Sequence, residues 1–272
     1  CYISKKKWVI KMPDSVPQAI AKSFAALTPA AVIMALFLMI RFIFAQTQYG
    51  SINLFILNVL QIPLVGVAAT YGGIMLSVFS SHLLWFFGIH GGSIVGAVTR
   101  PIYMATSLDN LAAFEAGNPL KYIVTQNFSD MYQGAGGVGA TLALSIMMIF
   151  LCKSKEMKTI GKLTVIPGIF GINEPMVYGL PLVLNPIIMI PFFVAPLVNI
   201  SIAYGFMHFG LSNFTTGVMI PWTTPPILSG ILSTNDIMGG VIQLISLIVT
   251  ALIYYPFMKI LDKKYLQTEL EL

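Results

Sequence analysis

Long apolar stretches, interrupted by glycine and proline, dominate the pattern of this chain. Residues 23–40, 65–87, 131–152 and 237–258 each predict a membrane-spanning helix, because about 20 apolar residues cross a bilayer. Residues 52–64 mix apolar and amide side chains, which predicts an amphipathic helix at the membrane interface. The pattern is that of an all-α integral membrane protein.

Two further apolar regions are broken. Residues 88–127 are rich in glycine, and residues 167–196 contain five prolines after position 174. Proline disrupts a continuous helix, but broken helices are tolerated in membranes where they line a cavity. We predict a re-entrant hairpin in each region, the first of which brings His90 toward Glu174. Paired interruptions of this kind indicate a transport site. Residues 153–162 read as a basic loop and 197–209 as a further helix.

Composition and charge agree with a membrane protein. The 272 residues are 57% hydrophobic and 9% charged, with a mean hydropathy of +0.84. The net charge of +5 comes from lysines beside the apolar stretches. That distribution is typical of cytoplasmic flanks, so the ends at 152 and 258 should both face the cytoplasm, and nucleic acid is not a predicted partner.

The start of the chain and its two cysteines bear on its extent and on metal binding. Cys1 in place of an initiator Met and a basic lead-in suggest that the sequence begins inside a longer protein, and no signal peptide is visible. Cys1 and Cys152 form no metal-binding or disulfide pattern. We therefore predict neither a metal nor a cofactor.

Glu174 is the most informative residue. No Asp, Glu, Lys or Arg occurs from 175 to 235, so we expect a buried carboxylate that is paired, hydrogen-bonded or protonated. An ionisable group at a break in a membrane helix is a functional candidate. A structural alternative is an ion pair with Arg100, the only Lys or Arg between 42 and 120, although Arg100 is equally suited to neutralising a phosphate.

Three other residues carry weaker signals. His90 is followed by Gly91 and Gly92, which allow a ligand close to the backbone, and Trp85 precedes it by five positions. Trp222 stands among prolines in Pro-Trp-Thr-Thr-Pro-Pro, where a sugar platform and an interfacial belt residue are both open. The GxGxxG match at 134–139 opens an apolar stretch, so helix packing is favoured over nucleotide binding.

Taken together, three motifs resemble enzyme IIC of the bacterial phosphotransferase system. They are Phe-Gly-Ile-His90-Gly, Phe-Gly-Ile-Asn173-Glu174-Pro and Ile-Pro-Trp222-Thr-Thr-Pro-Pro, in that order. The chain looks most like the lactose/cellobiose branch, which includes diacetylchitobiose transporters. The resemblance covers essentially the whole chain but lacks most of the N-terminal helices that mediate homodimer formation in the family.

The resemblance implies a permease of the bacterial cytoplasmic membrane. It would bind a disaccharide, carry it inward and present its 6-hydroxyl to a phosphocysteine on a separate IIB protein. Glu174 and His90 match the catalytic positions, and Asn173, Trp85 and Trp222 match positions near the sugar. Residues 1–50 would correspond to the last dimerisation helix, 51–64 to an interfacial linker and 65–272 to the transport domain. A proton-coupled sugar transporter remains the alternative, since the physics of a midplane carboxylate fits both, and a purely structural membrane subunit is the third.

Overall fold

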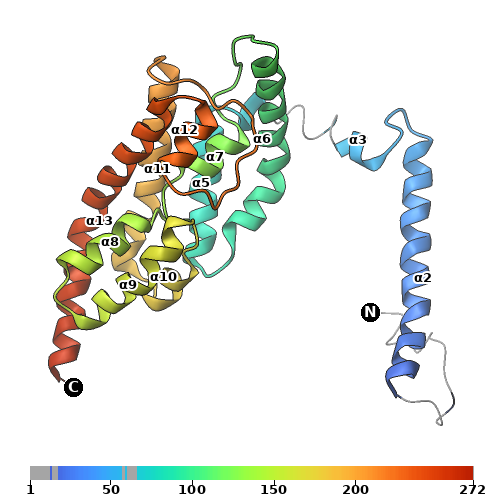
Figure 1. Cartoon of the computed structure of the whole chain (residues 1–272). Coiled ribbons are helices and arrows are strands. Elements are labelled where there is room, and N and C mark those ends of the chain that lie inside the picture. Colours follow the sequence, from blue (N-terminus) through green and yellow to red (C-terminus); the bar gives the residue numbers. More distant parts are fainter. Residues whose placement is uncertain (1–12, 14–17, 57–58, 60–65, 272) are drawn as a thin grey trace. The chain divides into compact units, whose positions relative to one another are not determined.

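The computed structural model describes residues 13, 18–56, 59 and 66–271 and is helical, with no strand among these residues. The chain divides into two compact units, Cys1–Pro63 and Leu64–Leu272 (Figure 1). Three described helices are long and apolar enough to cross a membrane: Phe24–Ala45, Pro186–His208 and Ile237–Glu271. The predicted class, an all-α integral membrane protein, agrees with these findings.

The first unit contains α2 (Gln18–Ala45) and α3 (Ile52–Ile56). Helix α2 includes the predicted span at 23–40 and continues through Pro29. Helix α3 accounts for the first five residues of the predicted amphipathic segment, and most of its remainder lies outside the described residues. The ring of Phe55 packs on Phe44 and Tyr49, which ties α3 to the end of α2.

The second unit opens with a pair of antiparallel helices, α5 (Tyr71–Phe86) and α6 (Gly91–Glu115). Helix α5 starts later than the predicted span because Thr70 caps it, accepting from the Gly73 N–H at 3.1 Å. The region 88–127 is not broken at its first arm, because α6 runs through Pro101. The chain after it folds back along α6, as the predicted hairpin requires: the Tyr122 N–H donates to Asn110 Oδ1 and the Gln126 N–H to Ser107 Oγ, both at 3.0 Å. Gly91 serves close packing instead: a Cβ there would lie 1.9 Å from the Ser81 carbonyl oxygen of α5.

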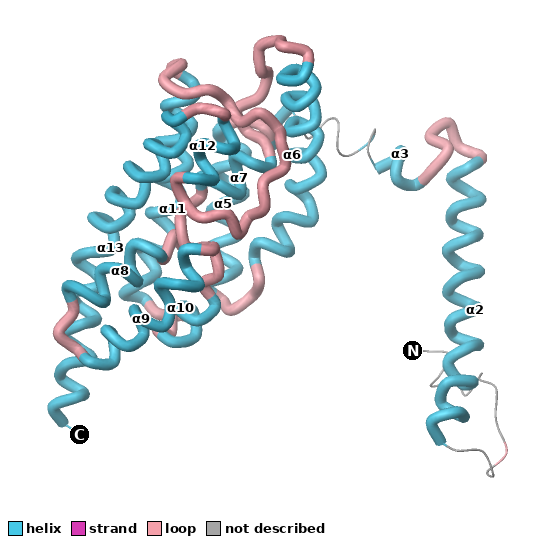
Figure 2. Tube along the Cα trace, viewed as in Figure 1, coloured by secondary structure: helices cyan, strands magenta, loops and turns pink. Residues whose placement is uncertain are grey.

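The predicted continuous span at 131–152 is wrong. Helix α7 (Gln126–Tyr132) ends early, and α8 (Leu142–Leu151) has ten residues. The segment between them is the GxGxxG stretch, which forms an irregular loop rather than a packing helix (Figure 2). Gly136 has φ +91°, and a Cβ there would meet the Leu142 backbone nitrogen at 2.3 Å. Glycine is therefore required by both conformation and space.

The predicted basic loop at 153–162 is the start of a helix, α9 (Lys155–Ile169). Ser154 caps it by accepting from the Met157 N–H at 3.1 Å, a signal that the lysines around it obscured. A break follows, containing only the short helix α10 (Glu174–Gly179). No helix runs from Glu174 through Pro181, as expected for a broken region.

The break ends at Pro186 rather than at Pro196. Helix α11 (Pro186–His208) contains Pro191 and Pro196 and includes the predicted helix at 197–209 up to His208. The hairpin prediction for 167–196 is thus wrong beyond residue 185. An irregular stretch and α12 (Leu228–Thr234) lead to α13 (Ile237–Glu271), which begins at the predicted position but continues past 258.

The two lysine-rich segments meet at one end of this unit (Figure 1). The Lys153 N–H donates to Asp262 Oδ1 at 2.8 Å, and Lys259 Nζ donates to the Leu151 carbonyl. This shared end is the one predicted to face the cytoplasm. Apolar side chains of α8 to α11 and α13 form a core there, and a second core lies between α5, α6, α7 and α11.

Candidate functional site

A cavity of about 700 Å³ opens between the α5–α6 pair, α7 and the break before α10. Its volume is in the range of pockets for small ligands. All six residues singled out in the sequence line it: Trp85, His90, Arg100, Asn173, Glu174 and Trp222. These residues lie up to 137 positions apart in the sequence, and the fold brings them to one cavity.

His90 is the N-cap of α6. Its Nδ1 accepts from the Ser93 N–H at 3.1 Å and lies 2.8 Å from the Ser93 hydroxyl. A backbone N–H can only donate, so Nδ1 is unprotonated in this arrangement and the ring proton of the neutral imidazole is on Nε2. His90 is exposed, and it therefore has a directed N–H donor available for a ligand.

Trp85 is mostly buried and packs against the His90 ring, with little of its own surface facing the cavity. Its side chain is 6% exposed and belongs to the apolar core. The indole packs against the His90 ring with centroids 4.6 Å apart. Its Nε1 is buried without a hydrogen-bond partner in the described part of the chain. The aromatic contact holds the imidazole in place from the α5 side.

Asn173 and Glu174 stand side by side at the start of α10. Asn173 is buried and donates from Nδ2 to the Val138 carbonyl at 2.6 Å, which fixes the break against the glycine loop. The expectation that Glu174 is buried is wrong, since its side chain is exposed. It lines the cavity, and its carboxylate makes no hydrogen bond with the described residues. The group is thus free to accept from a ligand hydroxyl.

Arg100 has a different neighbour from the one expected. It interacts electrostatically with Asp130 of α7, not with Glu174. Asp130 in turn accepts from Gln126 Nε2 at 2.8 Å. Because Arg100 follows His90 by ten helical residues, it lies ~15 Å further along α6.

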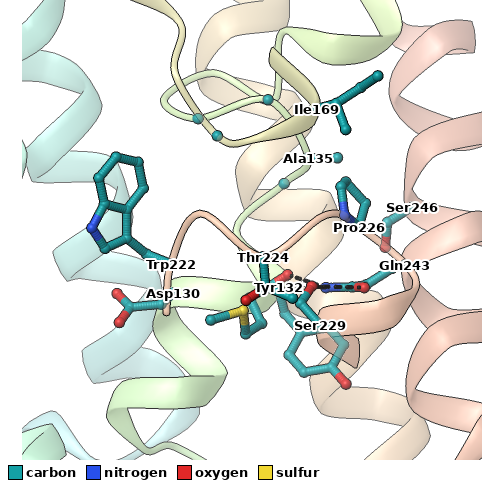
Figure 3. A pocket seen from close by; sticks show the side chains of 15 residues that line it. Asp130, Tyr132, Ala135, Ile169, Trp222, Thr224, Pro226, Ser229, Gln243 and Ser246 are labelled. Atoms are coloured by element: carbon teal, nitrogen blue, oxygen red, sulfur yellow. Dashed lines mark hydrogen bonds between the residues drawn. The ribbon is translucent and has the colours of Figure 1, made fainter. Parts of the chain in front are cut away.

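Trp222 is 58% exposed and marks where the cavity joins a side chamber of about 110 Å³. Figure 3 shows its indole on the same side of that chamber as the Asp130 carboxylate. Gln243, on the far side, is fully used by the fold, because its Oε1 accepts from the Ile227 and Gly230 N–H groups. Of the two tryptophans that line the cavity, Trp222 is the exposed one, whereas Trp85 is buried.

The sequence reasoning missed the contribution of α7. Gln126, Ser129, Asp130 and Gln133 all line the cavity. A signal was present, because these polar side chains cluster within eight residues immediately before an apolar stretch. Such a cluster beside a helix break indicates a cavity wall.

Comparisons with known proteins identify the family. The model of the phosphotransferase system EIIC family matches residues 1–196. The oligo-beta-mannoside-specific EIIC component of Bacillus subtilis (strain 168) is 42% identical over 270 residues, which is 99% of this chain and 61% of that protein.

The chain belongs to the EIIC family.

Other EIIC proteins are similar over comparable lengths. The cellobiose-specific EIIC component of Geobacillus stearothermophilus is 40% identical over 96% of this chain and 59% of its own length. A crystal structure of ChbC, the IIC component of an N,N'-diacetylchitobiose-specific phosphotransferase system, matches with a TM-score of 0.79 and 40% identity, over 98% of this chain and 62% of that one. The chain spans about three fifths of the length of these relatives. EIIC is an integral membrane component, in agreement with the apolar helices.

Cys152 is not a candidate nucleophile. It is buried after α8, and burial raises the pKa of its thiol to about 12, with the nearby Asp262 carboxylate acting in the same direction. A thiol needs its thiolate form to attack. No phosphocysteine on this EIIC residue is therefore expected.

Proposed function

We propose that this EIIC chain is the sugar-handling part of a phosphotransferase permease for a β-linked disaccharide. The protein would carry the sugar inward and present its 6-hydroxyl to a phosphocysteine of a separate IIB protein. The observation that carries the proposal is the convergence of His90, Asn173, Glu174 and Trp222 on one cavity. The relatives named for cellobiose, oligo-beta-mannoside and diacetylchitobiose support the substrate class.

The two catalytic candidates have complementary hydrogen-bonding roles. His90 Nε2–H donates, because Nδ1 is occupied by the Ser93 N–H. Glu174 accepts, because its carboxylate is unpartnered among the described residues. A sugar hydroxyl needs an acceptor for its proton and a donor for its oxygen. We assign Glu174 as the general base that takes the proton of the 6-hydroxyl, and His90 as the donor that orients the oxygen.

Phosphoryl transfer requires positioning and charge compensation more than covalent participation by the permease. In the transfer, the hydroxyl oxygen forms a bond to phosphorus as the sulfur–phosphorus bond of phospho-IIB breaks. The proton passes to Glu174 and the thiolate stays on IIB. The lysine-rich end places positive charge on the side from which IIB would approach. We further propose that the protein works as a homodimer through the N-terminal helices typical of its family.

Chemical identification of the transported sugar tests this function. Membranes that contain the protein are supplied with radiolabelled cellobiose, with or without phosphorylated IIB. The expected product is cellobiose 6-phosphate, formed only with phospho-IIB. Accumulation of unmodified sugar that collapses with an uncoupler would instead identify a proton-coupled transporter.

A further inference from the structure

His82 is a buried histidine whose two ring nitrogens are both occupied by main-chain groups. It lies on α5, eight residues before His90, and is 1% exposed. Its Nε2 accepts from the Gly139 N–H at 3.0 Å, so this nitrogen carries no proton. The ring is therefore neutral, and its proton is on Nδ1, which donates to the Val78 carbonyl at 2.7 Å. His82 is not among the residues that line the cavity, and both of its nitrogens are engaged, so it does not itself bind a sugar.

The loop segment Val138–Gly139 is the point where three elements meet. The Val138 carbonyl accepts from Asn173 Nδ2 at 2.6 Å, in the break before α10. The Gly139 carbonyl accepts from the Tyr254 hydroxyl of α13 at 2.7 Å. With the bond to His82, these contacts tie two adjacent residues to α5, to α13 and to the break.

Close packing leaves this segment little room to move aside. A Cβ on Gly139 would lie 2.4 Å from Cδ2 of the Phe192 ring, and a Cβ on Gly137 would lie 2.6 Å from the Gly171 carbonyl oxygen. The Phe192 ring also packs edge-on against His82, with centroids 5.3 Å apart. Because Gly139 is buried, its N–H would lose its hydrogen bond without gaining one from water if the imidazole acceptor were removed.

Two of the elements tied to this segment carry the proposed reacting groups. Helix α5 leads into the turn that ends at His90, and Asn173 immediately precedes Glu174. A displacement of the loop segment therefore changes the spacing between the imidazole and the carboxylate. Transfer reactions are sensitive to such changes, since a misplacement of ~1 Å can slow the chemical step ~10²-fold.

We infer that His82 is a positioning residue for phosphoryl transfer. It holds the segment Val138–Gly139 and, through that segment, sets the spacing between His90 and Glu174. The inference rests on the proposed function and deepens it: a third histidine-dependent contact, remote from the sugar, determines how fast the bound sugar reacts rather than how tightly it binds.

Two substitutions of His82 each keep one of its hydrogen bonds. Glutamine places its side-chain oxygen where Nε2 stands and can accept from the Gly139 N–H, whereas asparagine places its amide nitrogen where Nδ1 stands and can donate only to the Val78 carbonyl. In His82→Asn, transfer from phospho-IIB at saturating cellobiose is expected to fall ~10²-fold, while the Kd for cellobiose changes less than about threefold. In His82→Gln, both quantities should stay within about threefold of wild type. Rates are expressed per sugar-binding protein, counted by calorimetry, so a loss of folded protein alone does not change them.

A matched control and a second variant complete the test. His208→Asn and His208→Gln make the same changes at an exposed histidine at the end of α11 and should leave transfer and affinity unaltered. Tyr254→Phe keeps the buried ring and removes only the hydroxyl bonded to the Gly139 carbonyl, so it tests the segment even if the His82 variants do not fold. Its transfer rate should fall ~10-fold with the Kd unchanged.

The outcomes separate this inference from the proposed function. Equal transfer rates in His82→Asn and His82→Gln, or transfer at the wild-type rate in Tyr254→Phe, overturn the positioning role, whereas the permease function stands if the wild-type protein forms cellobiose 6-phosphate. A wild-type protein that forms no cellobiose 6-phosphate with phospho-IIB overturns the proposed function and the inference with it.

Discussion

At the scale of single residues, the candidate site was largely predictable, but its electrostatics were not. All six residues that the sequence motifs selected line the cavity, because uncommon polar and aromatic types at helix breaks stand out in an apolar chain. The prediction that Glu174 is buried was wrong, because the absence of charged residues near it in the sequence does not reveal that a cavity opens beside it. The partner of Arg100 was also unpredictable, because Asp130 reaches it from another helix.

Glu174→Gln separates binding from chemistry. Glutamine keeps the size and part of the hydrogen bonding but cannot take a proton. We expect transfer from phospho-IIB to fall by about 10²–10⁴, while sugar binding survives. Glu115→Gln, at the exposed end of α6, is the control. Transfer at the wild-type rate in Glu174→Gln would leave this carboxylate with a binding role only.

His90 has two roles that substitutions can separate. Alanine removes both the cap of α6 and the Nε2–H donor, whereas asparagine is a good N-cap that lacks the reach of the imidazole. His90→Ala should lose about 1 kcal/mol of stability together with sugar binding and transfer, and His90→Asn should recover the stability alone. Thermal unfolding and calorimetry make the comparison. Full recovery of sugar affinity by asparagine would mean that His90 acts only as a cap.

Trp222→Ala tests whether the exposed indole is a platform for the sugar ring. The side chain is more than half exposed, so its removal should affect folding little while sugar affinity falls ~10-fold, within the range for loss of an aromatic contact. Phe209→Ala removes an aromatic ring that is 77% exposed at the end of α11 and should leave affinity unchanged. Unaltered sugar affinity in a folded Trp222→Ala protein would remove this residue from the site.

At the scale of elements, the sequence predicted breaks correctly where proline stands between helices and wrongly where it stands inside them. Pro181 lies in a genuine break, but Pro191 and Pro196 are accommodated within α11. The span at 131–152 failed for the opposite reason. Hydropathy does not report the positive φ angles that the glycines after 133 adopt. Composition alone does not distinguish packing glycines, such as Gly91, from breaking ones.

The α5–α6 contact provides a test at this scale. Gly91→Ala would place a Cβ 1.9 Å from the Ser81 carbonyl oxygen, so α6 must shift and carry His90 with it. We expect reduced thermal stability and loss of sugar binding. Gly205→Ala, a helical glycine of α11 with open space around it, should be neutral or slightly stabilising. Equal thermal stability of the two variants would show that α5 and α6 do not need this close approach.

At the scale of the whole molecule, the lysine distribution predicts which end faces the cytoplasm. Single cysteines are introduced at Asn118, just after α6, and at Lys155, the first residue of α9, in a protein whose Cys1 is replaced by serine. Both positions are exposed, and the end of α6 and the start of α9 lie near opposite ends of the second unit (Figure 1). A membrane-impermeant maleimide should label position 118 in intact cells and position 155 only after permeabilisation. Buried Cys152, with its raised pKa, should contribute no background. The reverse labelling would invert the orientation.

The turn between α5 and α6 has a mechanical consequence. The Leu184 N–H donates to the Phe86 carbonyl at 3.0 Å, which joins the segment that ends in His90 to the segment that follows Glu174. The segments that carry His90 and Glu174 are therefore joined through the main chain. Any displacement that brings cargo from one face of the bilayer to the other has to keep this bond or break it. If it is kept, His90 and Glu174 move together, and under the proposed function a sugar would stay in contact with both residues until it reaches the side where phosphate is donated.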